Sequence, residues 1–300
     1  MLRRGSAEED ARLIDGKPSR TAQFVAASRA LGALLPDDAQ LADDPFGARV
    51  SGAAVARLAS LARRMPSLRP LLRVAAAPMM PMVAYMQVRT RLIDDVVRKF
   101  HGFGGNQIVL LGAGFDARAA RLGDGTLRFF EVDHPATQSL KRELFGDLRV
   151  TFVPWNFERD AMSTLGARLA ELGHDPARPT LTIWEGVTMY LTEPAIADTV
   201  AAVRAWSARG SQLCFSYVER RQIERPKLTT RIITTAVRVW GEPWTFGWEP
   251  RELPAWLTHH QWHLVSDEDV DAAGQRLLPR RFAALLRKTG DRHIAVAEPI

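Results

Sequence analysis

The segment QIVLLGAGFDARAARL, residues 107–122, decides the fold of this chain. It starts as an apolar run of strand length, which leads directly into Gly112-Ala113-Gly114, and a short helical segment follows at 117–121. Glycines at such a turn let the backbone bend sharply and come close to a ligand that lies across the strand end. A glycine pair alone is a weak signal, because any tight strand-to-helix turn can use it. The segment therefore predicts a strand, a turn and a helix, and its context must decide whether the turn also binds a ligand.

Four further apolar runs of strand length follow this segment. The first four of the five runs are nearly continuous in apolar or aromatic residues, which is typical of strands that are covered on both faces. Helical segments separate the runs, and this alternation predicts a Rossmann-like α/β fold with a doubly wound parallel sheet. The further runs lie at 127–135, 149–156, 181–187 and 212–218, and the helical segments lie at 117–121, 136–145, 161–172 and 194–209.

The chain before the first strand has a helical pattern. Apolar residues at helical spacing predict helices at 21–35, 46–64 and 83–101. No strand-like run interrupts them, so we expect residues 1–105 to form a helical cap on a core made of residues 106–300.

The chain after the fifth strand starts with an aromatic segment, which we expect to be a substrate lid inserted at 219–262. A helix at about 272–289 and a strand at 292–300 are predicted to close the fold. The tryptophans of the lid segment are Trp240, Trp244, Trp248, Trp256 and Trp262.

Composition narrows the class of protein. Three hundred residues, 46% of them hydrophobic and 25% charged, can bury one large core or one core with a small appendage. The net charge of +6 comes from basic residues interspersed with acidic ones, which argues against a nucleic-acid partner. The lone Cys214 excludes an internal disulfide, and no metal site is expected. The start has no apolar signal region and no run reaches the ~20 apolar residues of a membrane span, so we expect a cytoplasmic protein without a membrane partner.

The second predicted strand ends at an acidic residue. Asp133 follows Gly112 by 21 residues, near the spacing of about 20 at which a carboxylate binds the hydroxyls of a ribose. The alternative is a turn residue that merely ends the strand. The same spacing suits NAD, because Ala117 stands where the dinucleotide fingerprint tolerates alanine.

The third and fourth predicted strands also end in polar residues. Trp155 and Asn156 end the third, where the amide can donate to and accept from an adenine edge beside an aromatic neighbour, although a turn asparagine is an equal alternative. Glu185 ends the fourth, at the edge where open α/β sheets bind ligands. Burial of this carboxylate without a partner is costly, which favours a functional role.

Four segments in combination, LLGAGFDARAARL, FFEVDHP, WEGVTMYL and GEPWTFGW, resemble the leucine carboxyl methyltransferase family, including its bacterial branch of small-molecule O-methyltransferases. The resemblance covers roughly residues 20–298. It implies a class I methyltransferase fold with a helical cap and a lid, and S-adenosylmethionine as the cofactor.

The resemblance also implies roles for individual residues. Arg89 resembles the arginine that grips the cofactor's methionine carboxylate, and Arg29 supplements it. Glu185 resembles the residue near the cofactor's amino group. Asn156 departs from the family, which usually has an aspartate there. The full set of expected cofactor-binding residues is Arg29, Arg89, Gly112, Ala113, Gly114, Asp133, His134, Trp155, Asn156 and Glu185.

The expected reaction is methylation of the carboxylate of a small or medium-sized acid. Tyr190 and Tyr217 follow or end strands and are the candidates to contact the acceptor at the catalytic site, with a core position as the equal alternative. The competing hypotheses are methylation of a hydroxyl or phenol, a non-catalytic S-adenosylmethionine-binding protein, and an NAD-dependent oxidoreductase. The oligomeric state stays open. Candidates to pair with the acceptor's carboxylate are Arg220, Arg221, Arg225, Arg231 and Arg238.

Overall fold

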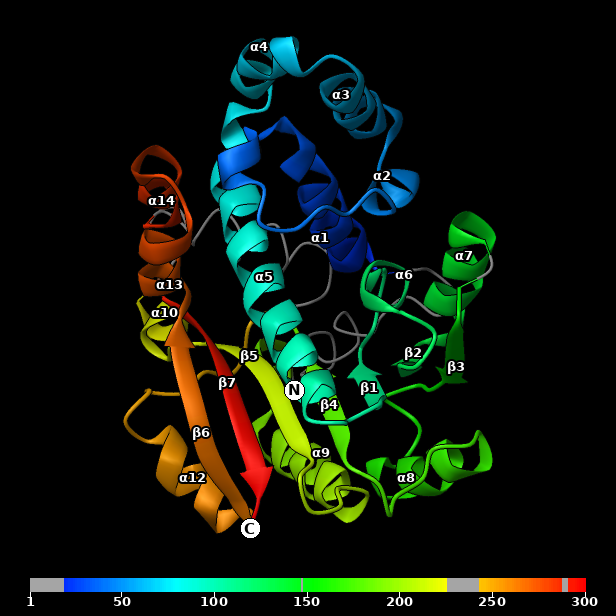
Figure 1. Ribbon diagram of the computed structural model, residues 1–300. Coiled ribbons are helices and arrows are strands. Elements are labelled where there is room, and N and C mark those ends of the chain that lie inside the picture. The colour runs from blue at the N-terminus through cyan, green and yellow to red at the C-terminus, as the bar shows by residue number, and fades with distance from the viewer. Residues whose placement is uncertain (1–18, 147, 226–242, 288–290) are drawn as a thin grey trace, which may run out of the picture.

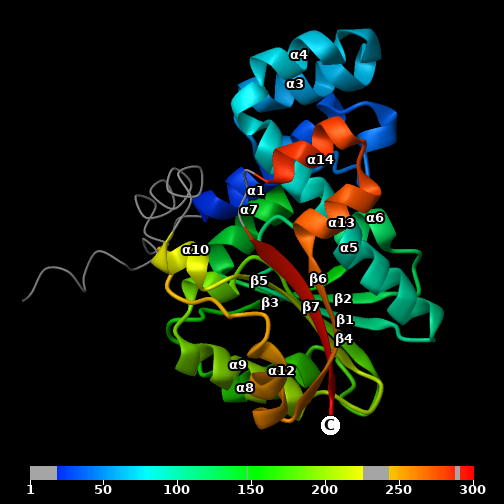
Figure 2. The same ribbon diagram turned by 90° about the vertical axis from the view of Figure 1, so that its left-hand side faces the viewer.

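The structure is a computed structural model that describes residues 19–146, 148–225, 243–287 and 291–300. A twisted sheet lies at its centre, helices cover both faces, and a group of N-terminal helices extends from one end (Figure 1; Figure 2).

The sheet has seven strands in the order β3-β2-β1-β4-β5-β7-β6. The first five strands along the chain are mutually parallel, as predicted, whereas β7 runs antiparallel to both of its neighbours. The strands are β1 (Gln107–Leu111), β2 (Arg128–Asp133), β3 (Val150–Pro154), β4 (Thr180–Trp184), β5 (Gln212–Val218), β6 (Trp262–Asp269) and β7 (Arg292–Pro299).

Helices connect the parallel strands in the predicted order. The last of them shows how sequence sets the boundary: the Thr192 side chain caps the helix by accepting from the N–H of Ala195, and Pro194 occupies the first turn, where no N–H is needed. The helices are α6 (Arg118–Leu122), α7 (Pro135–Phe145), α8 (Met162–Glu171) and α9 (Glu193–Ala205).

From residue 19 onward five α-helices precede the sheet, and we call them the cap helices. The segment predicted as one helix at 46–64 is broken at Ser51 and Gly52, both of which have extended backbone. The cap helices are α1 (Arg20–Ala30), α2 (Gly47–Val50), α3 (Ala53–Arg64), α4 (Arg69–Ala75) and α5 (Met80–Gly102). The long α5 runs diagonally across one face of the sheet (Figure 1).

The C-terminal part differs from the prediction in two ways. The edge strand β6 was not predicted, because its sequence WHLVSDED is polar and only the first of its eight residues is buried. The helix expected at 272–289 is two helices, α13 (Val270–Leu277) and α14 (Arg280–Leu286), since Pro279 cannot continue the helix hydrogen bonds. Two further helices are α10 (Arg221–Glu224) and α12 (Leu253–His259).

Each face of the sheet has its own apolar layer. Ile108, Leu110 and Cys214 face the layer that contains α5, α13 and α14, whereas Val109 and Phe215 face the layer of α8, α9 and α12. Cys214 is fully buried, as its apolar surroundings predicted. Among the described residues no single helix is long and apolar enough to cross a membrane, and residues 66–75 and 77–102 meet that test only jointly, across a bend of 85°.

Candidate functional site

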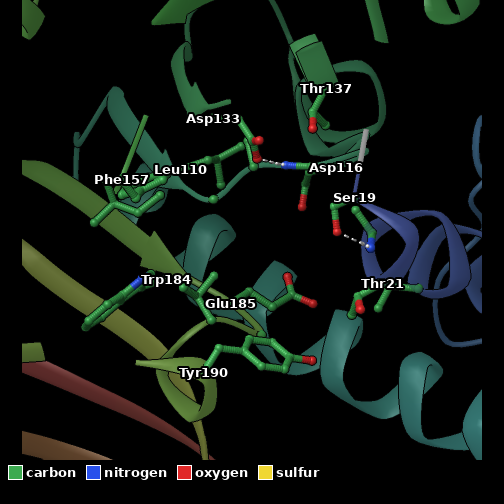
Figure 3. Close-up of a pocket in the computed structure, with 18 of the residues that line it drawn as sticks. Ser19, Thr21, Leu110, Asp116, Asp133, Thr137, Phe157, Trp184, Glu185 and Tyr190 are labelled. Carbon is green, nitrogen blue, oxygen red and sulfur yellow. Dashed lines mark hydrogen bonds between the residues drawn. The ribbon is translucent and has the colours of Figure 1, made fainter. Parts of the chain in front are cut away.

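A cavity of about 440 Å³ lies where β1, β2 and β4 end. Its wall combines core residues with residues of the cap helices, among them Thr21, Arg29 and Arg89. Glu185 and Tyr190 lie on one side of the cavity, and Asp133 and Thr137 lie on the opposite side (Figure 3). This is the strand-end position at which open α/β sheets bind ligands.

The glycine turn forms the floor of the cavity. Gly112 and Gly114 have φ values of +66° and +51°, which residues other than glycine adopt only at a cost in free energy. A Cβ atom at Gly112 would lie 2.7 Å from Cγ2 of Val187. The N–H groups of Gly112 and Ala113 both donate to the carbonyl of Val132, which fixes the turn against β2. The turn therefore needs its glycines for both conformation and space.

Asp133 is held rigidly beside this turn. Its carboxylate accepts from the backbone N–H of Gly114 at 2.5 Å and from that of His134 at 2.6 Å. Burial raises the pKa of Asp133, and the two N–H donors oppose that rise. Each carboxylate oxygen retains a lone pair for a further donor, so the group can accept from two neighbouring hydroxyls.

Glu185 lies between two arginines. Its carboxylate is 2.6 Å from Nε of Arg89 and 2.5 Å from a terminal nitrogen of Arg118. Burial by itself raises the pKa of Glu185, but Arg118, Arg89 and Arg29 outweigh burial and hold the pKa well below its usual range. Glu185 is thus an ionised carboxylate at the cavity wall, with the cationic partners that its burial required.

Sequence reasoning missed the residue that organises this wall. Arg118 is 1% exposed and also pairs with Asp94 of α5, at 2.9 Å, and with Asp116. Asp94 additionally pairs with Arg121 at 2.7 Å. The spacing of Asp116 and Arg118 was visible in the sequence, but charged residues at the start of a short helix usually face solvent.

Arg29 lines the cavity with its guanidinium already engaged. It donates to Asp44 at 2.8 Å and to the carbonyl of Phe115 at 2.7 Å. These contacts tie α1 to the loop that follows the glycine turn, so the cap and the core meet at the cavity.

Three residues expected at the site do not line the cavity. Trp155 is buried in the α8 and α9 layer, and the side-chain oxygen of Asn156 accepts from the N–H of Glu158 within the same turn. The next residues, Phe157 and Glu158, line the cavity instead. The hydroxyl of Tyr217 donates to Asp267 at 2.6 Å, so this side chain is committed elsewhere. The β3 end was placed correctly, but the residue facing the cavity was displaced by one or two positions.

Residues of the segment expected to be the lid occupy several different environments. Trp248 and Trp262 pack in the core beneath β5 and β7, and Pro243 and Thr245 line the cavity. Arg220 pairs with Glu252, and Arg221 pairs with Glu219 and Asp291. Arg225 is exposed, whereas Trp240, Arg231 and Arg238 lie outside the described residues. None of the described arginines of the predicted set lines the cavity.

The strand order, the antiparallel β7 and the strand-end cavity together define the class I methyltransferase fold. The chain belongs to the leucine carboxyl methyltransferase family, whose family model matches residues 22–204, more than half of its length.

Comparison with individual proteins agrees with this assignment. A protein of Streptomyces avermitilis that is provisionally assigned as an S-adenosyl-L-methionine-dependent methyltransferase is 35% identical over 186 residues, which are 60% of this chain and 62% of that protein. A similarly assigned protein of Mycolicibacterium smegmatis is 29% identical over 87% of this chain and 86% of its own length. The chain thus matches about 60% of the length of the Streptomyces avermitilis relative.

Two crystal structures share the fold across nearly the whole chain. A DUF574 family protein of Streptomyces avermitilis has a TM-score of 0.55 at 15% identity and covers 96% of this chain and 100% of its own. A provisionally assigned methyltransferase of Thermobifida fusca has a TM-score of 0.56 at 18% identity and covers 96% of this chain and 97% of its own.

Proposed function

We propose that this protein is an S-adenosylmethionine-dependent O-methyltransferase that converts a carboxylate of a small or medium-sized acid into a methyl ester. The observation that carries the proposal is the joining, in one cavity of about 440 Å³, of a glycine turn, a fixed acidic β2 end and a buried arginine–glutamate pair. The volume is in the range of small-molecule sites.

The residues present fit the cofactor. Gly112 and Gly114 leave room for close approach of its methionine and ribose parts, and Asp133 offers two acceptors to the ribose hydroxyls. Arg89 suits the methionine carboxylate and Glu185 suits the amino group, so that the ligand's two charges would join the existing ion pair. When bound, S-adenosylmethionine supplies an electrophilic methyl group on a sulfonium.

The chain's own contribution to the reaction is positioning. A carboxylate acceptor is ionised near neutral pH and needs no base. Its oxygen forms the new bond to the methyl carbon as the carbon–sulfur bond breaks, which leaves a neutral ester and S-adenosylhomocysteine. Tyr190, whose ring lies at the cavity wall next to Glu185 (Figure 3), is placed to orient the acceptor. Pro243 and Thr245, from the segment expected to be the lid, line the cavity and would contact the bound ligands.

Calorimetric titration with S-adenosylmethionine, NAD and NADP tests the cofactor. We expect S-adenosylmethionine alone to bind, and we expect Asp133→Asn to weaken it about tenfold, since a charge-assisted hydrogen bond contributes about 1.5–3 kcal/mol. Asp95→Asn, on the exposed side of α5, is the control and should bind as the wild type does. Binding of a nicotinamide cofactor instead would refute the proposal.

The acceptor class is tested separately by mass spectrometry of products. Incubation with S-adenosylmethionine and a panel of acids, alcohols and phenols should produce methyl esters. An ether product would show that the acceptor is a hydroxyl or phenol and not a carboxylate, and the proposal of an S-adenosylmethionine-dependent O-methyltransferase would stand. Cofactor binding without transfer to any acceptor would favour a non-catalytic binding protein.

A further inference from the structure

Arg292, the first residue of β7, differs from the other buried arginines. Among the described residues, four arginines are buried, and three of them have carboxylate partners: Arg29 with Asp44, Arg89 with Glu185, and Arg118 with three acids. Arg292 is 5% exposed and forms no ion pair with any residue that the structure describes. A buried charge without a counter-charge is costly, so its presence needs an explanation.

Aromatic rings surround this guanidinium. Its central carbon lies 4.3 Å from the ring centre of Tyr85 and 5.5 Å from that of Trp244. Stacking on aromatic faces offsets part of the cost of burying the charge. Burial lowers the pKa of Arg292 and the nearby charge of Arg89 lowers it further, whereas Tyr85, through a side-chain hydrogen bond and its charge, and Tyr190 oppose that fall.

Arg292 and Trp244 do not themselves line the cavity, but residues next to both of them do. The ring of Tyr85 contacts the guanidinium groups of both Arg292 and Arg89, at 4.3 Å and 5.3 Å from its centre, and Arg89 lines the cavity. Trp244 stands in the chain between Pro243 and Thr245, both of which line the cavity. Tyr190 at the wall also contributes to the electrostatic surroundings of Arg292.

A neutral donor next to Arg292 lacks an acceptor. Nε1 of Trp244 is buried and has no hydrogen-bond partner in the described part of the chain. Buried indole N–H groups usually find an acceptor. A buried cation without a carboxylate partner lies 5.5 Å from the ring centre of an indole whose N–H lacks an acceptor. This pair matches a carboxylate, which accepts several hydrogen bonds and carries the missing charge.

We propose that Arg292 and Trp244 form a carboxylate-binding subsite next to the cofactor cavity, and that this subsite selects acids as the methyl acceptors. The inference rests on the proposed function, because it assigns the acceptor end of the same site. The candidate arginines at 220, 221 and 225 are exposed or paired with acids, whereas Arg292 combines burial with an unmatched charge.

Binding of defined probes to the complex with S-adenosylhomocysteine tests the subsite. The probes are phenylacetate and hexanoate, with phenylacetamide and hexanamide as neutral counterparts of nearly equal shape. We expect both acids to bind in calorimetry and to raise the melting temperature, and we expect the amides to do neither. Failure of both acids to bind the wild type overturns the proposal.

Two variants locate the effect. Arg292→Met should weaken the acids about tenfold or more, and Arg292→Lys, which keeps the charge without the planar fork, should weaken them less. Arg220→Met, a half-exposed lid arginine paired with Glu252, is the control and should leave acid binding unchanged. Affinity for S-adenosylmethionine, measured in parallel, should stay near the wild-type value and shows that each variant is folded.

The outcomes separate this proposal from the proposed function. If acids bind through Arg292 and no methyl ester forms, the subsite stands and carboxyl methylation fails. If esters form and Arg292→Met retains the preference for acids over amides, carboxyl methylation stands and the subsite is wrong. If Arg292→Met loses S-adenosylmethionine instead of the acids, the arginine serves the cofactor and the subsite is also wrong.

Discussion

Alanine substitutions at two glycines distinguish the cost of backbone strain from the loss of contact with the cofactor. Gly112 and Gly104 both have positive φ values, but a Cβ atom at Gly104 meets nothing within 4 Å, whereas one at Gly112 meets Val187 in the cavity wall. We expect either alanine variant to lose about 1–2 kcal/mol of unfolding free energy through backbone strain. Only Gly112→Ala should also lose affinity for S-adenosylmethionine in calorimetry. Equal affinity in both variants would mean that the turn does not touch the cofactor.

A second residue-scale prediction concerns pH. Burial by itself lowers the pKa of His293, but its hydrogen bonds to Asp267 and Glu219 and the charges of Asp267 and Asp269 outweigh burial and raise it. A raised folded-state pKa stabilises the fold fully below the unfolded value of 6.5, and this contribution disappears as pH rises through the folded-state pKa.

Denaturant unfolding between about pH 6 and pH 9 measures this loss. His293→Gln should flatten the decline of unfolding free energy with pH, by up to about 1.4 kcal/mol per pH unit. His263→Gln, at an exposed position of β6, should leave the decline unchanged. A wild-type profile that is flat over this range, or one that both variants reproduce, would show that His293 does not govern it.

At the scale of elements, α5 carries two adjacent aspartates with opposite surroundings. Asp94 is 1% exposed and pairs with Arg118 and Arg121, whereas Asp95 pairs with Arg91 and Arg98 at the surface. Asp94→Asn leaves buried guanidinium charge uncompensated and should lower the free energy of unfolding by about 3–5 kcal/mol. Asp95→Asn should change it by less than about 1 kcal/mol. Denaturant unfolding curves of the two variants measure this difference. Similar losses of unfolding free energy in both would contradict the role assigned to Arg118.

The elements that were predicted correctly are those with a clear sequence pattern, such as an apolar run of strand length. Apolar runs of strand length identified β1 to β5, and the spacing from Gly112 to Asp133 placed two parts of the cavity correctly. β6 was missed because it is a polar edge strand, in which burial does not select apolar residues. Tryptophans of the expected lid look alike in sequence whether they line a cavity or pack in a core, and Trp248 and Trp262 pack in the core.

At the scale of the whole molecule, the parts that escaped prediction depend on contacts distant in sequence. Arg118 became identifiable only when Asp94 and Glu185 were seen around it, and Arg292 only when its lack of a carboxylate was seen. Charge compensation is a property of the folded arrangement, so a list of charged residues does not reveal which of them remain unmatched. The strand ends, by contrast, meet at one edge in any parallel sheet, which is why Asp133 and Glu185 were predicted together.

The guanidinium of Arg118 also has a consequence for how this protein can change over generations. Arg118 pairs with Asp94 of the cap and with both Asp116 and Glu185 of the core. The charge of this core arginine is therefore compensated partly by the cap, so the two parts of the chain cannot change independently at these positions. A chimera that took its cap from a relative without an acid at this position would leave the recipient's arginine undercompensated. A cap can therefore be exchanged only with a relative that has an acidic residue at the position of Asp94.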